Sequence, residues 1–195
     1  MRKLWFFTVL LAMPLGLWAQ GPAPLVKVKV GRSIKLMLPQ NMRPMSKEEI
    51  NNKYLSSRAP LAMYTTQDSR IDFGIKTSNS RFATNDLPLA AQFYRANLVG
   101  LYDSVNFLRE EIEVINDRQF LVFEFNSMVM PEEGSLSALV GNSSGKPVNM
   151  YTYIQYTLVN NQVVVFNFSC PQVYQDKWRT AAWHIMHSLK IKKTL

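Results

Sequence analysis

Cysteine and histidine are scarce in this sequence. Its 195 residues include one cysteine, Cys170, and two histidines, His184 and His187. A single thiol cannot form a disulfide within the chain, so the core alone must stabilise the fold. Cys170 follows an apolar run, and no neighbour in the sequence would lower the pKa of its thiol. We therefore predict a buried cysteine that acts as a small hydrophobe rather than as a reactive group.

Acidic residues are outnumbered: 14 Asp and Glu stand against 22 Lys and Arg, and the formal net charge is +8. The basic residues are spread along the chain, apart from a C-terminal lysine group. This distribution indicates a solvated surface with a weak preference for acidic membranes or partners. The sequence has no basic stripe, nucleic-acid recognition motif or internal repeat, so nucleic-acid binding is not expected. The hydrophobic fraction of 47% supports one packed domain.

The N-terminus lacks an apolar run long enough for a typical membrane helix. Leu4 to Leu17 is apolar but falls short of the roughly 20 residues that a span needs. Because Arg2 and Lys3 precede this run and Ala19 follows it, residues 1–19 have the pattern of a secretory signal peptide cleaved after Ala19. The alternative is a retained membrane anchor. No cysteine lies at the cleavage site, so there is no lipobox. We expect a periplasmic or secreted protein with no transmembrane segment after cleavage.

The most informative stretch, Met150 to Leu195, predicts a strand, a tight turn, a second strand and a long closing helix. Asn160-Asn161 separates the strands, and asparagine tolerates the positive φ of a two-residue hairpin turn. The second strand is almost continuously apolar over 163–168, so it should be covered on both faces and lie centrally in a sheet. Pro171 ends that strand. The helix, expected to run on toward the C-terminus, has one apolar stripe: Tyr174, Trp178, Ala181, Ala182, Ile185 and Leu189.

The preceding chain predicts hairpins separated by helices. Ser46 and Glu49 form a capping box that starts a short helix. Asn85-Asp86, with Pro88 in the first turn, starts a second helix that runs to about Asp103. The predicted strands are 25–30, 34–38, 61–65, 70–77, 107–115 and 120–129.

These elements predict an α+β fold, in which an α/β/α sandwich is built on a mostly antiparallel sheet of six to eight strands. We interpret residues 20–32 as an N-terminal tail with an edge strand, and residues 33–195 as a single domain. Residues 131–149 are rich in glycine and form a predicted loop insertion; a loop of this length is often functional or disordered.

Three segments carry a resemblance to the Mog1/PsbP-like fold family. They are the strand Ile34 to Pro39, the hairpin Met63 to Thr77, and Phe166 to Ile191, where a strand ending FNFSCP leads to a helix ending HSLKI. The resemblance covers about residues 33–192 and implies the sandwich predicted above. Members of the family serve in photosystem assembly, GTPase binding and the bacterial envelope. The resemblance thus implies a fold, leaves function open and supplies no catalytic residue.

Residues with chemical potential occur without the partners that known reactions need. His184 and His187, three apart on a predicted helix, are either a metal pair or two solvated histidines. The stretch Gly134 to Ala138 departs from the G-x-S-x-G nucleophile elbow at its fifth residue. Asp103-Ser104-Val105 matches an O-glycosylation pattern of some exported bacterial proteins, or simply marks a helix C-terminus.

Four glutamates on two predicted strands raise the question of paired carboxylates: Glu110, Glu111, Glu113 and Glu124. Strict alternation would place Phe107, Arg109 and Glu111 on one face. We favour an exposed, charged sheet edge beside Arg109 and Arg118 over a catalytic pair. No catalytic, cofactor-binding or metal-binding residue is assigned.

The leading hypothesis is an exported, non-enzymatic binding or accessory protein of the bacterial envelope. It would act through contacts with an envelope protein partner, using the 131–149 loop and an exposed sheet edge. The alternative is a periplasmic carrier of a small apolar ligand, held between sheet and helix by aromatic side chains. No cofactor is expected under either hypothesis.

Overall fold

The computed structural model describes residues 22–54, 59–83, 86–130 and 146–192. The strands are β1 (Leu25–Val30), β2 (Ile34–Pro39), β3 (Met42–Pro44), β4 (Ala62–Thr66), β5 (Asp72–Arg81), β6 (Ser104–Ile115), β7 (Arg118–Val129), β8 (Val148–Val159), β9 (Gln162–Pro171) and β10 (Lys190–Ile191). The helices are α1 (Lys47–Lys53), α2 (Leu87–Leu101) and α4 (Gln175–His187), with a 3-10 turn, η1 (Gln172–Tyr174), before α4. The predicted signal peptide and most of the predicted 131–149 loop lie outside these ranges.

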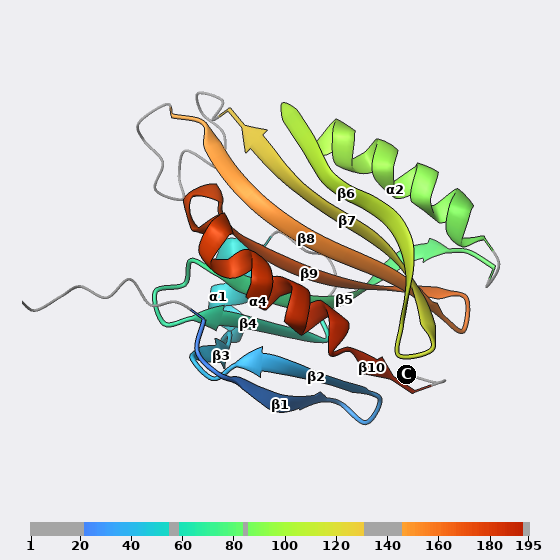
Figure 1. Cartoon of the computed structure of the whole chain (residues 1–195), viewed down its shortest axis with the longest axis horizontal. Helices are drawn as coiled ribbons and strands as arrows, with labels where there is room; N and C mark the ends of the chain where they lie inside the picture. Colours follow the sequence, from blue (N-terminus) through green and yellow to red (C-terminus); the bar gives the residue numbers. More distant parts are fainter. Residues whose placement is uncertain (1–21, 55–58, 84–85, 131–145, 193–195) are drawn as a thin grey trace, which may run out of the picture.

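The principal sheet is antiparallel and seven-stranded, in the order β3-β4-β5-β9-β8-β7-β6 (Figure 1). Strand β9 has three neighbours on either side, and its apolar residues are buried on both faces. This confirms the central strand predicted from its continuous apolar run. The hairpin turns also follow the sequence: Asn160 and Asn161 have φ of 51° and 59°, and Asn116 and Asp117 have φ of 48° and 64°. Such paired left-handed residues make the two-residue turn that matches the strand twist.

The principal sheet is covered on both faces, as the α/β/α prediction requires (Figure 1). Helix α4 packs on one face over a core that includes Trp178, Phe166 and Phe168. Helix α2 packs on the other face over Phe123 and Phe125. Side chains of successive strand residues point to opposite faces, which is why one strand supplies both cores. The predicted α+β sandwich is confirmed.

A second, three-stranded sheet, β1-β2-β10, lies beside α4 and was not predicted as a separate unit. Its formation corrects the prediction of the closing helix, which ends at His187 rather than continuing through Leu195. Ser188 caps this end: its Oγ accepts a hydrogen bond from Met37 N at 2.8 Å and donates to Ile185 O at 2.6 Å. Beyond it, β10 pairs with β2. Leu189 lies between α4 and β10 and is buried, so its apolar character follows from burial outside the helix.

The edge strand β6 differs from the strict alternation predicted for it. Its register with β7 shifts between Phe107 and Arg109, so Leu108 is an extra residue. Such a bulge places neighbouring side chains differently from a regular strand. Phe107 therefore packs on the α2 face with Phe123 and Phe125, whereas Arg109 lies on the α4 face with Tyr153. Helix α2 also ends earlier than predicted, at Leu101, and β6 begins at Ser104.

The helix starts are confirmed in one case and partly in the other. Ser46 and Glu49 form the predicted capping box of α1. At α2 the N-cap is Asp86, with Pro88 in the first turn, but the Asp86 side chain makes no cap hydrogen bond to the helix. Instead, its carboxylate accepts a hydrogen bond from Ala83 N at 3.2 Å.

Candidate functional site

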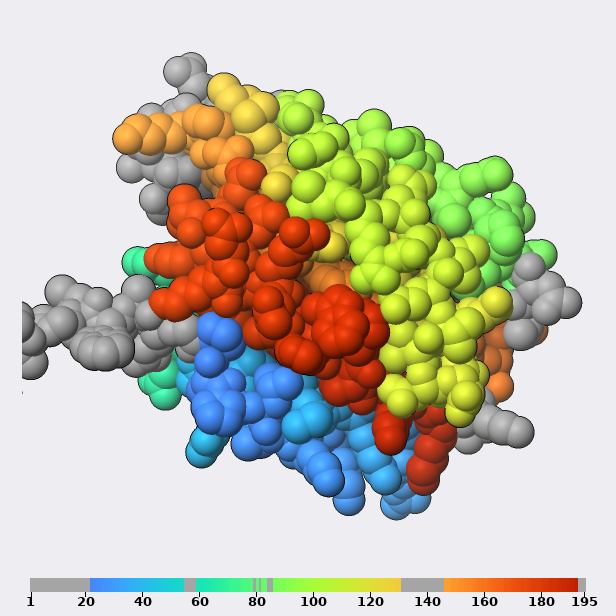
Figure 2. Space-filling model, viewed as in Figure 1, coloured from blue at the N-terminus to red at the C-terminus, as the bar shows by residue number. Residues whose placement is uncertain are grey.

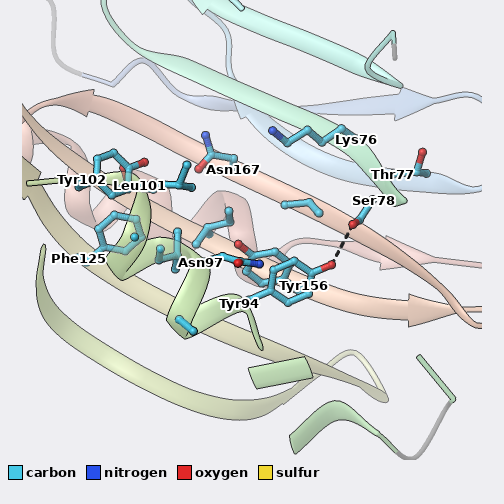
Figure 3. Close-up of a pocket in the computed structure, with 16 residues that line it drawn as sticks. Lys76, Thr77, Ser78, Tyr94, Asn97, Leu101, Tyr102, Phe125, Tyr156 and Asn167 are labelled. Atoms are coloured by element: carbon cyan, nitrogen blue, oxygen red, sulfur yellow. Dashed lines mark hydrogen bonds between the residues drawn. The ribbon is translucent and has the colours of Figure 1, made fainter. Parts of the chain in front are cut away.

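A trough lies on the sheet face that carries α2, between that helix and strand β5 (Figure 3). We call it the α2 trough; its volume is about 670 Å³. The floor comes from β8 and β9, one wall from α2, and the opposite wall from β5. The lining residues are Lys76, Thr77, Ser78, Tyr94, Ala96, Asn97, Leu98, Gly100, Leu101, Tyr102, Phe125, Thr152, Ile154, Tyr156, Val165 and Asn167.

The trough exists because α2 covers only part of its sheet face. The buried stripe of α2, with spacings of three or four residues, packs over β7 and β8. That stripe is Leu87, Ala90, Tyr94 and Leu98. Strand β5 lies beyond β9 at the other side of this face, outside the core over which the stripe packs. Alternation in β8 and β9 then turns Ile154, Tyr156 and Asn167 toward the uncovered space.

Neutral aromatic rings line the trough. Tyr94 stacks on Tyr156 with ring centroids 4.0 Å apart, and its hydroxyl donates to Ser78 Oγ at 3.0 Å (Figure 3). Tyr102 packs on Phe125 at the other end, 5.9 Å between centroids. Burial raises the pKa of both Tyr102 and Tyr156 above the ordinary tyrosine value, so neither phenol ionises near neutral pH. The rings thus offer apolar faces and neutral hydroxyls.

The helical wall exposes apolar side chains along the rim. Leu101 is 68% exposed and Phe93, one helical turn from Asn97, is 43% exposed. Between them Gly100 leaves open space, since a Cβ built there would meet no atom within 4 Å. Arg95 is the one charged residue of α2. It is engaged elsewhere, donating to Glu110 on β6 at 3.0 Å. The helical wall thus exposes Leu101 to the trough, with Asn97 as a polar neighbour and no side chain at Gly100.

The trough also has a polar part, which includes Ser78, Asn97 and Asn167, and Lys76 is its one charged lining residue. Lys76 and Asn167 line it and also line an adjoining small hollow of about 50 Å³ under α1, so the two spaces meet at these residues. Among the described residues, no Asp or Glu lines either space. The small hollow depends on Gly74, because an added Cβ would lie 2.5 Å from Met63 Sδ. The trough can therefore accept an apolar group, with one cation at its margin.

The glutamates singled out in the sequence are divided between the two faces. Glu110 lies on the α2 face with Arg95. Glu111 and Glu113 lie on the α4 face, where both pair with Arg109, and Glu113 also contacts His187 Nε2 at 2.8 Å. Each of these carboxylates has a cationic or imidazole partner, as expected for a charged sheet edge.

Glu124 and Arg118 depart from the predicted exposed edge. Glu124 is buried and accepts hydrogen bonds from Arg179 Nε at 2.6 Å and from Tyr151 Oη at 3.0 Å. Burial raises the pKa of Tyr151, so the phenol remains a hydrogen-bond donor. Arg118 lies away from the carboxylates and donates to Leu158 O at 2.9 Å. Glu124 thus anchors α4 to the sheet.

The surroundings of the other residues discussed in the sequence indicate no chemical role. Cys170 is buried, as predicted. His184 is exposed and contacts the Trp183 ring, whereas His187 stacks on Trp183 with centroids 3.8 Å apart. In the described ranges, no group of three His, Cys, Asp or Glu side chains is placed to hold a metal. Ser104 is exposed at the start of β6 rather than at a helix end. The Gly134 to Ala138 stretch lies outside the described residues.

Comparison with solved structures identifies the fold. The chain matches cyanobacterial PsbP from Synechocystis with a TM-score of 0.59 and 10% identity, covering 92% of this chain and 100% of that one. It matches the Ran-binding protein Mog1p of Saccharomyces cerevisiae at 0.53 and 11%, covering 87% and 96%. It matches LpqN of Mycobacterium tuberculosis, described as involved in cell envelope biogenesis, at 0.52 and 12%, covering 87% and 91%.

The chain therefore has a Mog1/PsbP-like fold, as its sequence segments predicted. No protein-family model and no curated protein matches its sequence. Identities of 10–12% establish the architecture alone, because one fold hosts many functions. None of the helices in the described ranges combines the length and apolar character that crossing a membrane requires. The function must be argued from the sites.

Proposed function

We propose that this chain is an exported, non-enzymatic binding protein of the bacterial envelope that holds an apolar segment of a partner protein in the α2 trough. The observation that carries this proposal is an exposed apolar rim beside neutral aromatic rings: Leu101 lines the trough, and Phe93 packs edge-on against the lining residue Tyr94. Export rests on the signal-peptide pattern of residues 1–19, and it places the protein in the periplasm or outside the cell.

A protein partner accounts for the rim as well as the floor. A small molecule usually binds in a pocket that encloses most of its surface. Such a ligand would cover the floor of the trough but leave the exposed apolar rim in contact with water. Large apolar side chains that lie together on a surface commonly mark a protein contact. A partner segment lying along the helix would cover the rim and insert side chains onto Tyr94 and Tyr156.

The test compares two positions in the last turn of α2. Leu101 lines the trough and Val99 does not, yet both are exposed apolar residues. A photo-crosslinking amino acid is placed at each position in the native host. We expect a discrete protein adduct from position 101, a much weaker one from position 99, and loss of the first adduct when Gly100→Phe fills the trough. Equal adducts at both positions, or none at position 101, would contradict the proposal.

A second candidate is a carrier of a small apolar ligand, which the stacked Tyr94 and Tyr156 rings between helix and sheet favour. The trough volume lies within the range of small-ligand sites, roughly 300–1,000 Å³. Native mass spectrometry of protein purified from its own envelope would show a stoichiometric bound molecule that Gly100→Phe removes. A consistently empty protein would exclude this carrier function.

A further inference from the structure

The three-stranded sheet carries a row of lysines on one face. In the register of this sheet, Lys29 lies opposite Lys35, and Lys35 lies opposite Lys190. Lys27, two residues from Lys29, shares the face. All four side chains belong to exposed residues. Residues near both ends of the chain thus form one surface, which we call the lysine face.

A depression of about 430 Å³ runs between this face and the end of α4. The four lysines line it together with Asn116, His187 and Ser188, and no acidic residue of the described chain does so. Figure 2 shows where the N-terminal hairpin, the closing segment and the β6–β7 turn meet. Two acidic residues belong to the adjoining strand and turn: Glu113 contacts His187 and Arg109, and Asp117 is one negative charge at the turn beside the four lysines.

A further cation at this end has no carboxylate partner among the described residues. Arg118 donates to two carbonyl oxygens, Leu158 O at 2.9 Å and Lys192 O at 3.4 Å. Neutral carbonyls accept these hydrogen bonds without cancelling the positive charge of the guanidinium. Lys192 itself is exposed beside Ser33, to whose carbonyl its backbone N–H donates at 2.9 Å. The positive potential of the lysine face is therefore reinforced rather than neutralised.

Like charges directly opposite each other on a sheet are destabilising. Side chains of opposite charge at these positions would stabilise the strand pairing. The row Lys29-Lys35-Lys190 is therefore not explained by a contribution to the stability of the sheet. Lysines are flexible point charges, and the described residues that line the depression include no arginine whose fork would suit one phosphate. A row of separate, flexible amines suits a broad anionic surface better than a single small anion, because each amine can reach a different headgroup.

We propose that the lysine face docks on a bilayer that contains anionic phospholipid. Each lysine near such a surface contributes by attraction to the negative surface potential, which decays within a Debye length. The face lies on the α4 side of the molecule, whereas the α2 trough lies across the principal sheet. Membrane docking is thus independent of the partner site proposed above.

The test is co-sedimentation of the mature chain with vesicles of phosphatidylcholine, with and without phosphatidylglycerol. We expect binding only with phosphatidylglycerol, and weakening as salt rises. Lys29→Gln and Lys35→Gln should each lower vesicle affinity about fivefold. A charge-matched control, Lys47→Gln with Lys146→Gln, removes two exposed lysines that line neither the depression nor the α2 trough, and should retain most of the affinity. The Lys35→Gln variant should melt at the same or a higher temperature, because its charge repels two neighbours.

Three results would overturn the proposal. One is equal loss of vesicle binding in the Lys29/Lys35 double variant and in the Lys47/Lys146 control, which would indicate net charge alone. Another is displacement from vesicles by inorganic phosphate at constant ionic strength, which would indicate a site for a small anion. Binding to pure phosphatidylcholine with the same affinity would exclude the electrostatic basis altogether.

Discussion

Glu124 is one of two buried carboxylates among the described residues, the other being Asp72. Its partners come from different elements: Tyr151 on β8 and Arg179 on α4. Removing the carboxylate leaves the buried Tyr151 hydroxyl without its acceptor, and an unpaired buried donor costs more than the bond contributed. The Arg179 side chain is about half exposed, so solvent screens the contribution of the Glu124–Arg179 ion pair to stability.

We therefore expect Glu124→Ala to lower the free energy of unfolding by about 2 kcal/mol. Glu110→Ala on the neighbouring strand is the control, because the Glu110–Arg95 pair is exposed and should contribute no more than about 0.5 kcal/mol. Urea denaturation of both variants checks this. If both variants lose the same free energy of unfolding, Glu124 contributes no more to stability than an exposed carboxylate does.

Cys170 provides a second test at the residue scale. Burial raises the pKa of its thiol to about 12, so the nucleophilic thiolate is almost absent at pH 8. We expect the native protein to resist a thiol reagent such as iodoacetamide at that pH and to react fully once denatured. Modification of the native protein at the rate of a free thiol would place Cys170 at the surface.

At the scale of elements, α1 shows a short helix held by its first turn. Ser46 Oγ accepts from Glu49 N at 3.1 Å, and Ser46 N donates to Glu49 Oε2 at 2.8 Å. Arg43 donates to both oxygens of the same carboxylate. The hydrogen bonds from Arg43, followed by that from the Ser46 backbone, hold the pKa of Glu49 down at about 2.

The sign of the pH dependence follows from this lowered pKa. The contribution of Glu49 is fully present above its ordinary pKa of 4.5 and is lost as the pH falls toward about 2. We expect the amide protons of Ser46 and Tyr54 to lose protection from exchange across this acidic window. In Glu49→Gln their protection should be lower at neutral pH and nearly independent of pH. Unchanged amide protection in Glu49→Gln would show that the Ser46–Glu49 capping box does not stabilise α1.

Two other elements show where sequence patterns fall short. The end of α4 depends on Met37 N bonding to Ser188, a contact between residues 151 positions apart. The bulge at Leu108 in β6 depends on its register with β7. Both features depend on residues far apart in the chain. Apolar periodicity therefore extended the closing helix too far, and strict alternation placed Phe107 on the same face as Arg109. The hairpin turns and the α1 cap were predicted correctly because their causes are local.

At the scale of the whole molecule, the principal sheet separates two surfaces. The α2 trough is on one face, and the lysine face is beside α4 on the other. If both proposals hold, the protein can contact a partner and a membrane at once. The sheet edge offered by β6, by contrast, carries charged residues and a bulge, both of which hinder the addition of another strand. This favours the trough over the edge as the protein contact.

A prediction for the intact protein concerns processing. We expect the natively exported chain to begin at Gln20, and intact-mass measurement will show this directly. If Ser104, exposed at the start of β6, is glycosylated, the mass will exceed that of the bare chain from Gln20, and Ser104→Ala will remove the excess. A mass equal to the bare mature chain would exclude glycosylation, and a retained N-terminus would exclude the signal peptide.

The sequence by itself determined the fold class, the central strand β9, the hairpin turns, the α1 cap and the burial of Cys170. These follow from local periodicity, turn chemistry and the placement of apolar residues. Only the tertiary structure decided the two surfaces proposed here to bind. The α2 trough exists because one helix leaves part of its sheet face uncovered, and the lysine face exists because the two ends of the chain pair in one sheet. Both depend on contacts between residues far apart in the chain, which no local pattern encodes.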